Sequence, residues 1–276
     1  MSDYRFLTVA RDGDVVTCTM ANPPRHTLVA PEVAELARLV ASLAQDETVR
    51  AVVFTGAGDG VFIAHYEVGE LATSAEAQVE RGGRGLARDA SPAAHTELHA
   101  MHRLILSLSR APFVTIAAIN GNTAGGGLEF ALGCDFRLAL AGEFRLGLPE
   151  TGVGIIPGAG GTQRFARLLG TARALDLILH GATVTPALAL ELGIVHRVLD
   201  APSFRAEVAA FAQNLASRAP IALAAAKRAI YDGAEVALEA GLAIEQREFD
   251  RCMRSRDAAV AMRSLLEGKP WSWIGR

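Results

Sequence analysis

The sequence predicts an α/β fold followed by a helical carboxy-terminal region. Short apolar strands alternate with helical segments from about residue 1 to residue 198. From about residue 202 the glycines become rarer, and long segments rich in alanine, leucine and arginine follow one another. Such an alternation is typical of buried parallel strands that are covered by helices. We therefore predict a core over residues 1–198 and a helical region over residues 199–276.

The first part of the core is predicted to be a hairpin, a helix and a buried strand. Alternating apolar residues over 4–9 and 15–20 flank an Asp-Gly-Asp turn, which indicates two antiparallel strands. Pro31 opens a helix with one buried stripe, because apolar residues recur behind it at helical spacing. The stripe consists of Val33, Leu36, Leu39, Val40 and Leu43. The continuous apolar run 51–55, closed by Gly56, predicts the strand.

The rest of the core contains a second buried strand over residues 113–119, and a helix over 128–132 that follows three glycines. Between Glu70 and His99 the periodic pattern fails, and glycines stand among charged residues. A long loop of this kind is either a functional lid or a mobile insertion, and the sequence favours neither. The carboxy-terminal region is predicted to form four helices, over residues 204–218, 221–231, 236–256 and 257–266.

The composition excludes several classes of function. With 276 residues, half of them hydrophobic, the chain can bury a large core. The chain has 27 Lys and Arg residues and 30 Asp and Glu residues, so it lacks the excess of positive charge expected of a protein that binds nucleic acid. No apolar run approaches the roughly 20 residues that a membrane helix needs. The cysteines Cys18, Cys134 and Cys252 lack metal-ligand spacing, so core roles and a reducing compartment are expected. We expect a soluble, cytoplasmic protein.

The run Gly125-Gly126-Gly127 is the most informative local motif. It stands just ahead of an apolar helix, so it leaves backbone N–H groups uncovered at the positive end of the helix dipole. Such groups can hold an oxyanion. A phosphate cradle of the Walker type is excluded, because no Gly-Lys-Ser/Thr follows. The short motif Gly56-Ala57-Gly58 lacks the third glycine of a dinucleotide fingerprint, so a tight turn after a strand is the better interpretation.

Two glutamates lie beside glycine-rich segments. Glu129 is placed near the start of an otherwise apolar helix, where a buried carboxyl has a raised pKa suited to proton transfer. Glu150 follows Pro149 and precedes a glycine-rich stretch that can bring backbone close to a ligand. From the residues alone, a capping or surface role is as good an interpretation for each glutamate as a catalytic one.

The ordered set of motifs resembles the crotonase (enoyl-CoA hydratase/isomerase) superfamily. It extends over nearly the whole chain, as far as Leu266-Glu267-Gly268-Lys269-Pro270. In order, the motifs are Asn22-Pro23-Pro24, Ala118-Ile119-Asn120-Gly121, Ala124-Gly125-Gly126-Gly127-Leu128-Glu129, Cys134-Asp135-Phe136-Arg137, Gly147-Leu148-Pro149-Glu150, Gly152-Val153-Gly154-Ile155-Ile156-Pro157-Gly158, Gly160-Gly161-Thr162-Gln163-Arg164 and Gly193-Ile194-Val195-His196-Arg197-Val198.

The resemblance implies a spiral of repeated β-β-α units, and a helical region over residues 199–276 that joins subunits into trimers or pairs of trimers. It implies an oxyanion hole made by the backbone N–H groups of Tyr66 and Gly126. Glu129 would act as the general base on a water molecule, and Glu150 would deliver a proton to the α-carbon. Family positions that contact the substrate or its coenzyme A correspond to Ala64, Val68, Arg25 and Lys269.

The activity implied is the reversible hydration of a 2-enoyl-CoA thioester, with no cofactor or metal beyond the coenzyme A of the substrate. Isomerisation of a double bond, or another enolate reaction on the same fold, is the alternative. A protein of this fold that binds RNA or a partner without turnover is a third possibility, which the two glutamates and the lack of a basic surface disfavour.

Three features depart from the family pattern. The loop that commonly reads Ser/Ala-Ala-Gly-Ala-Asp is Ile63-Ala64-His65-Tyr66-Glu67 here, so a phenol is expected to narrow or polarise the acyl pocket. His65 is either a proton carrier or a solvent-facing or packed histidine. The glutamates are 21 positions apart, one more than the commonest spacing, with the extra residue expected within 140–143. The stretch 70–99 is longer than usual, and its arginines either cover the coenzyme A phosphates or are solvated.

Overall fold

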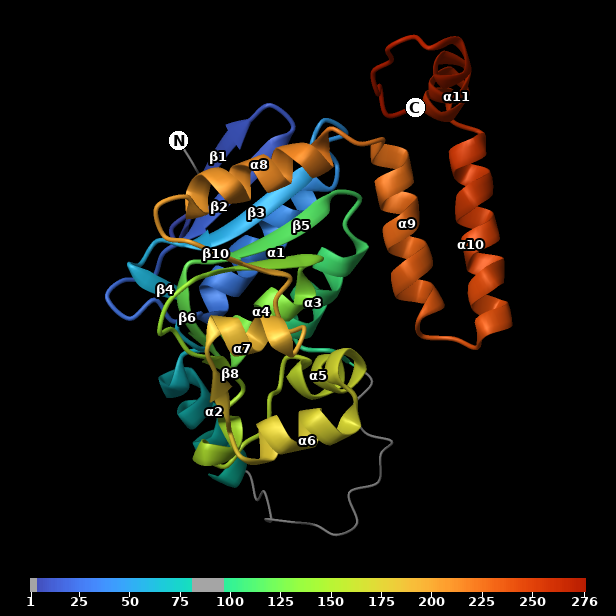
Figure 1. Cartoon of the computed structure of the whole chain (residues 1–276). Helices are drawn as coiled ribbons and strands as arrows, with labels where there is room; N and C mark the ends of the chain where they lie inside the picture. Colours follow the sequence, from blue (N-terminus) through green and yellow to red (C-terminus); the bar gives the residue numbers. More distant parts are fainter. Residues whose placement is uncertain (1–3, 81–96) are drawn as a thin grey trace.

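The computed structural model describes residues 4–80 and 97–276, which form two sheets surrounded by helices (Figure 1). The larger sheet has the strand order β1-β2-β3-β5-β7-β10 and the smaller one β4-β6-β8-β9. The pairs β1–β2 and β8–β9 are antiparallel, and the other described pairs are parallel. The predicted α/β class and the predicted hairpin are therefore confirmed. The strands are β1 Leu7–Asp12, β2 Val15–Met20, β3 Ala51–Gly56, β4 Gly60–Ile63, β5 Val114–Ile119, β6 Gly121–Ala124, β7 Phe136–Leu140, β8 Leu146–Gly147, β9 Thr183–Val184 and β10 Arg197–Leu199.

The chain winds as a spiral of β-β-α turns. In each of the consecutive pairs β3–β4, β5–β6 and β7–β8, the first strand joins the larger sheet and the second joins the smaller one. Helices follow each pair, and a 3₁₀ helix, Glu150–Val153, follows β8. The helices are α1 Ala30–Leu43, α2 Val68–Glu80, α3 Ala100–Arg110, α4 Gly126–Gly133, α5 Gly161–Leu169, α6 Thr171–Leu179, α7 Pro186–Glu191, α8 Phe204–Ala216, α9 Pro220–Gly233, α10 Leu238–Met253 and α11 Arg256–Glu267.

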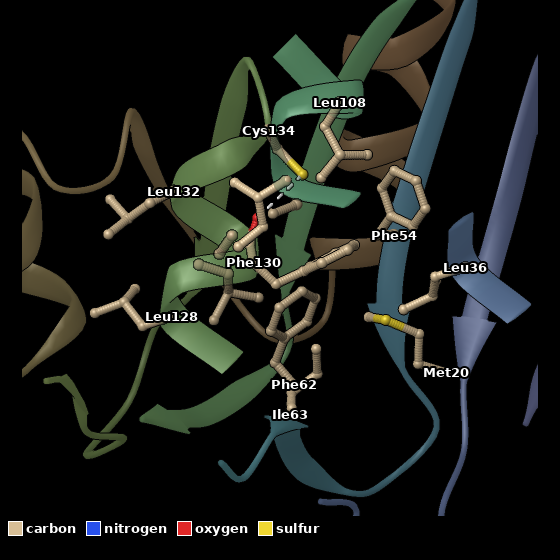
Figure 2. Packing of buried hydrophobic residues seen from close by; sticks show 14 of the residues in the cluster. Met20, Leu36, Phe54, Phe62, Ile63, Leu108, Leu128, Phe130, Leu132 and Cys134 are labelled. Atoms are coloured by element: carbon tan, nitrogen blue, oxygen red, sulfur yellow. Dashed lines mark hydrogen bonds between the residues drawn. The ribbon is translucent and has the colours of Figure 1, made fainter. Parts of the chain in front are cut away.

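The main core joins β4, the strand before Tyr66, to α4, the helix that begins within the glycine run. Figure 2 shows Phe54, Phe62 and Phe130 packed together among leucines. The Phe54 and Phe130 rings meet edge to face with centroids 5.2 Å apart, and Phe62 lies on the other side of Phe130 at 6.5 Å. Aromatic pairs of this geometry stabilise beyond the area that they bury. The cluster therefore holds the strand before Tyr66 against the helix that begins at Gly126.

The other face of the larger sheet is covered by α8. Phe204, Val208 and Ala212 pack on sheet residues such as Val53 and Ile116, which alternate along their strands with residues of the main core. The period of two in a strand places neighbouring residues on opposite faces. Both faces of the sheet are thus buried, which explains why β3 and β5 are continuous apolar runs.

The four predicted carboxy-terminal helices are present as α8 to α11, and α9 to α11 form an arm that extends away from the sheets (Figure 1). The arm is anchored by a buried ion pair at 2.7 Å between Lys227 of α9 and Asp135. Lys227 also donates to the carbonyl of Phe113, and the Tyr231 hydroxyl donates to Asp135. A buried pair with this many partners is costly to break from one side, so it ties α9 to the core.

The expectation of a loop from Glu70 onward was wrong for residues 70–80, which belong to α2. Apolar residues do recur at helical spacing here, but two of them are alanines and none is buried, so the stripe is weak. Residues 81–96, including Arg81, Arg84 and Arg88, lie outside the described residues. Cys18 and Cys134 are buried as expected, whereas Cys252 on α10 is only half-buried.

The motif Gly56-Ala57-Gly58 forms a turn held by Asn120, whose side chain bonds to the backbone of Gly56 and Gly58. The interpretation as a tight turn after a strand is therefore confirmed. Among the residues that the structure describes, no helix is both long and apolar enough to cross a membrane.

Candidate active site

A cavity of about 740 Å³ lies where the chain after β4, the start of α4 and the 3₁₀ helix meet. Most of its wall is apolar and comes from side chains such as Val33, Leu71, Met101 and Ile156. A large apolar cavity with a few convergent polar groups is the usual form of a ligand site. Of the residues that the sequence singles out, His65, Tyr66, Val68, Gly125, Gly126, Glu129 and Glu150 line this cavity.

The backbone N–H groups of Tyr66 and Gly126 lie close together at the cavity. A Cβ built on Gly126 would be 3.5 Å from the Tyr66 nitrogen. Leu28 pairs with the chain on both sides of Tyr66, because its N–H donates to His65 and its carbonyl accepts from Glu67. Within the described residues, neither the Tyr66 N–H nor the Gly126 N–H donates a hydrogen bond. Two free donors that converge in this way can stabilise an oxyanion.

Gly127 allows the two donors to approach each other. A Cβ at this position would lie 2.4 Å from the Ile63 carbonyl oxygen and 2.7 Å from the Thr123 hydroxyl. Any side chain would therefore push α4 away from the segment that carries Tyr66. Gly125, the residue before the helix, has φ +50°, a left-handed conformation that glycine adopts without strain.

Glu129 is buried in the first turn of α4, with 2% of its surface exposed. Its Oε1 accepts hydrogen bonds from the backbone N–H groups of Ala159 and Gly161, each at 2.7 Å. Burial raises the pKa of Glu129, and the two N–H groups oppose this by stabilising the charged form. The raised pKa that the sequence predicts is therefore confirmed. A Cβ on Gly161 would lie 2.9 Å from Oε1, so glycine is needed there for this contact.

Glu150 opens the 3₁₀ helix and faces the same cavity. Burial, with a smaller contribution from the charge of Glu129, raises the pKa of Glu150 to about 7. Its Oε2 is buried and has no hydrogen-bond partner among the described residues. A carboxyl group with this pKa exchanges a proton readily near neutral pH. The structure thus brings together Glu129 and Glu150, two acid-base groups on one cavity.

The side chain of Tyr66 lines the cavity and is held by a residue that the sequence does not single out. Its hydroxyl donates to Oε2 of Glu70 at 2.7 Å, and the same carboxylate accepts from the backbone N–H of Ala30 at 3.1 Å. Burial and the neighbouring Glu70 raise the pKa of Tyr66, so the phenol stays protonated. His65 turns its Nδ1 to the Tyr66 carbonyl at 2.7 Å. The only sign of the Tyr66–Glu70 contact in the sequence is the spacing of four positions between the two residues.

Val68, at the start of α2, lines the cavity, whereas the other predicted substrate contacts do not. Ala64 uses its N–H and its carbonyl in backbone bonds to His26 and Ala124. Arg25 is exposed and pairs with Glu67 at 3.4 Å. Lys269 lies just after α11 and pairs with Glu267, the last residue of that helix, at 2.8 Å. The chain by itself therefore does not bring these three residues to the cavity, since each is held elsewhere by its own backbone or ion-pair contacts.

Comparison with known proteins places this geometry in a family. The sequence profile of the family Enoyl-CoA hydratase/isomerase matches residues 10–276. The chain is 35% identical over 269 residues to enoyl-CoA hydratase domain-containing protein 2, mitochondrial, of Mus musculus, covering 95% of this chain and 85% of that protein. It is 30% identical to the short-chain-enoyl-CoA hydratase of Clostridium acetobutylicum over 258 residues, 93% of each chain.

Among solved structures, the enoyl-CoA hydratase from Bacillus anthracis is similar to this fold with a TM-score of 0.87 and 30% identity, covering 99% of this chain and 100% of that chain. The match of the profile over most of the chain, the identity to these relatives and the shared fold agree with one another. The chain therefore belongs to the enoyl-CoA hydratase/isomerase family, the crotonase superfamily.

Proposed function

We propose that the protein catalyses the reversible hydration of a 2-enoyl-CoA thioester to a 3-hydroxyacyl-CoA. The observation that carries this proposal is the meeting of two carboxyl groups with raised pKa values and two free backbone N–H groups on one cavity. Hydration needs both kinds of group. The donors bind the carbonyl oxygen as it gains charge, and the carboxyls move the protons of water.

The chemistry divides among four groups. The thioester carbonyl accepts hydrogen bonds from the N–H groups of Tyr66 and Gly126. Glu129 removes a proton from a water molecule while the oxygen of that water bonds to C3, and the electrons of the C2–C3 double bond move onto the thioester oxygen as an enolate. Glu150 then delivers its proton to C2, and the carbonyl re-forms. Each preorganised donor is typically worth roughly 3 to 4 kcal/mol for the charged intermediate.

The test is to offer the protein a panel of 2-enoyl-CoA thioesters and to follow the loss of the conjugated absorbance. Hydration predicts a decrease and a 3-hydroxyacyl product. Isomerisation predicts instead that 3-enoyl-CoA substrates gain the conjugated absorbance. A lack of turnover with all of these substrates would favour a crotonase-fold protein that only binds a partner. The presence of Glu129 and Glu150 together favours hydration, because the reaction uses both an acid and a base.

The rate of hydration should fall as the pH rises through about 7. Glu150 delivers a proton, so its protonated form is the active one, and its pKa is raised to about 7. Above that pH, kcat/KM should decrease by about tenfold per pH unit, because kcat/KM reports groups of the free enzyme. The measurement is kcat/KM between pH 5 and 9. A flat profile from pH 7 to 9 would contradict the role of Glu150 as the acid.

Tyr66→Ala should retain hydration and widen the range of acyl groups. The oxyanion donor belongs to the backbone, whereas the phenol occupies the cavity wall. Overpacking a site typically costs roughly 1 to 3 kcal/mol, so the ratio of kcat/KM for long over short substrates should rise about tenfold. Tyr66→Phe is the matched control, since it keeps the ring and removes the bond to Glu70. An unchanged ratio would show that the side chain does not limit the acyl group, and loss of all activity would make the phenol catalytic.

We further propose that the protein assembles as a trimer or a pair of trimers in the cytoplasm. The arm of α9 to α11 presents large exposed apolar side chains, among them Leu238, Leu242, Phe249 and Leu266. Apolar surface of this extent is usually covered by a partner. Sedimentation at micromolar concentration should therefore give a trimer or hexamer, and a strictly monomeric species would contradict the proposal.

A further inference from the structure

His99 lies at the edge of the cavity, directly before α3, and contacts the segment that holds Glu129. The imidazole lines the cavity together with Gly158 and Ala159. No local motif indicates a role for His99, because 59 positions separate it from its partner Gly158.

The two nitrogens of His99 have different partners, and these partners decide which nitrogen donates and which accepts. Nε2 lies 2.7 Å from the carbonyl oxygen of Gly158. Nδ1 accepts the backbone N–H of His102, at 3.4 Å. A carbonyl oxygen can only accept, so Nε2 must carry a proton, whereas Nδ1 must be bare to receive the N–H. The contacts therefore make Nε2 the donor to Gly158 and Nδ1 the acceptor from His102.

The ring of His102 keeps the exposed imidazole of His99 in place. The two rings are stacked with centroids 3.8 Å apart and an interplanar angle of 25°. Burial, together with the neighbouring His99, lowers the pKa of His102, which favours an uncharged ring beneath the stack. Because the stack and the bond from the His102 N–H both orient the imidazole, the bond from Nε2 to Gly158 does not depend on a freely rotating side chain.

The carbonyl that His99 holds belongs to the same peptide group as the N–H that holds Glu129. Nε2 binds the oxygen of the Gly158-Ala159 peptide, and the nitrogen of that peptide donates to Oε1 of Glu129 at 2.7 Å. A peptide group is planar, so an anchor on its oxygen fixes the direction of its N–H. Hydrogen bonds in series also polarise one another.

We propose that His99 is a positioning residue for Glu129. Its Nε2–H fixes and polarises the Gly158-Ala159 peptide group, and that group in turn holds the carboxylate. Within the part of the chain that the structure describes, His99 forms no hydrogen bond to Glu129, so it acts through the peptide. The inference rests on the proposed function only in that Glu129 serves as the base of the reaction.

The consequence is a change in the proton affinity of Glu129. The charged and titratable groups that act on this carboxyl are His99, Arg164 and Glu150, beside the N–H groups of Ala159 and Gly161. Hydrogen bonds to the charged form lower a pKa, so weakening the Ala159 bond must raise the pKa of Glu129. The base is active when ionised. Loss of the His99 anchor should therefore shift the acid limb of kcat/KM to higher pH.

The experiment compares His99→Gln with His99→Phe. The amide of glutamine can replace the Nε2–H donor, whereas phenylalanine keeps a ring over His102 and removes the donor. Neither variant keeps the imidazole Nδ1 that accepts the His102 N–H. We expect the acid limb to move up by about one pH unit in His99→Phe, a tenfold loss on that limb, and to stay near the wild-type position in His99→Gln. His180→Gln, at an exposed histidine bonded to Asp176, is the control.

A second measurement does not need turnover. Hydrogen exchange of the Ala159 and Gly161 amides should be faster in His99→Phe than in wild type and close to wild type in His99→Gln. If wild type hydrates no enoyl-CoA, the proposed function fails, and this measurement still tests the anchor. Equal shifts of the acid limb in both variants would show that His99 acts through its charge. An unchanged pH profile and unchanged amide exchange in His99→Phe would show that the contact is incidental. Either result would overturn the proposal.

Discussion

Glu129→Gln should lower kcat/KM for hydration by about 10²- to 10⁴-fold, the range expected for a positioned acid or base. The amide has the shape of the carboxyl and can still accept from Ala159 and Gly161 through its oxygen. It cannot take a proton from water. The substitution therefore tests the chemistry of the group with little change in packing.

Glu150→Gln should cause a loss in the same range, because the protonated carboxyl supplies the proton for C2. Binding of a saturated acyl-CoA, measured by calorimetry, is the control for both variants and should stay nearly unchanged, since neither carboxyl is proposed to hold the nucleotide. Activity within about tenfold of wild type in either variant would remove the corresponding residue from the mechanism.

Gly127→Ala should lower kcat by about 10²- to 10³-fold, the usual effect of losing one oxyanion donor. The new Cβ would meet the Ile63 carbonyl oxygen at 2.4 Å and the Thr123 hydroxyl at 2.7 Å, so it has no room. Because Ile63 ends β4 three positions before Tyr66, the clash separates the Tyr66 N–H from the Gly126 N–H.

Gly152→Ala is the matched control for this prediction. Gly152 also lines the cavity, but a Cβ there would meet nothing within 4 Å. It should keep activity close to that of wild type. Thermal unfolding of both variants separates an effect on the site from an effect on folding. A folded Gly127→Ala protein with near-normal kcat would show that the two donors do not depend on this close approach.

Several parts of the fold and the site could be predicted from the sequence because each has a local pattern. The buried strands β3 and β5 appear as continuous apolar runs, and α1 shows its apolar stripe. The glycine run before an apolar helix points to free N–H groups. In contrast, α2 was not predicted, because its apolar stripe is weak: Val68, Leu71 and Val79 are exposed, and the other apolar positions are alanines.

Some residues assigned from the family pattern line the cavity and others do not, and the difference depends on which contacts hold them. Tyr66, Val68 and Gly126 line the cavity, because the backbone places them: Tyr66 lies between β4 and α2, Val68 begins α2, and Gly126 begins α4. Arg25 and Lys269 are long side chains on exposed segments, and each pairs with a nearby glutamate instead. A motif can position a backbone group, but the direction of an exposed side chain depends on its partners.

The sequence by itself determined the α/β class, the hairpin, the helical arm, the family and the two glutamates, because these depend on apolar periodicity, turn residues and ordered motifs. Only the tertiary structure decided how those glutamates are tuned. The pKa of Glu129 depends on its burial and on N–H groups 30 and 32 positions away. The Tyr66 hydroxyl is held by Glu70 in the first turn of α2. Proton affinity is set by the solvent and the donors around a group in space, and distant segments supply both.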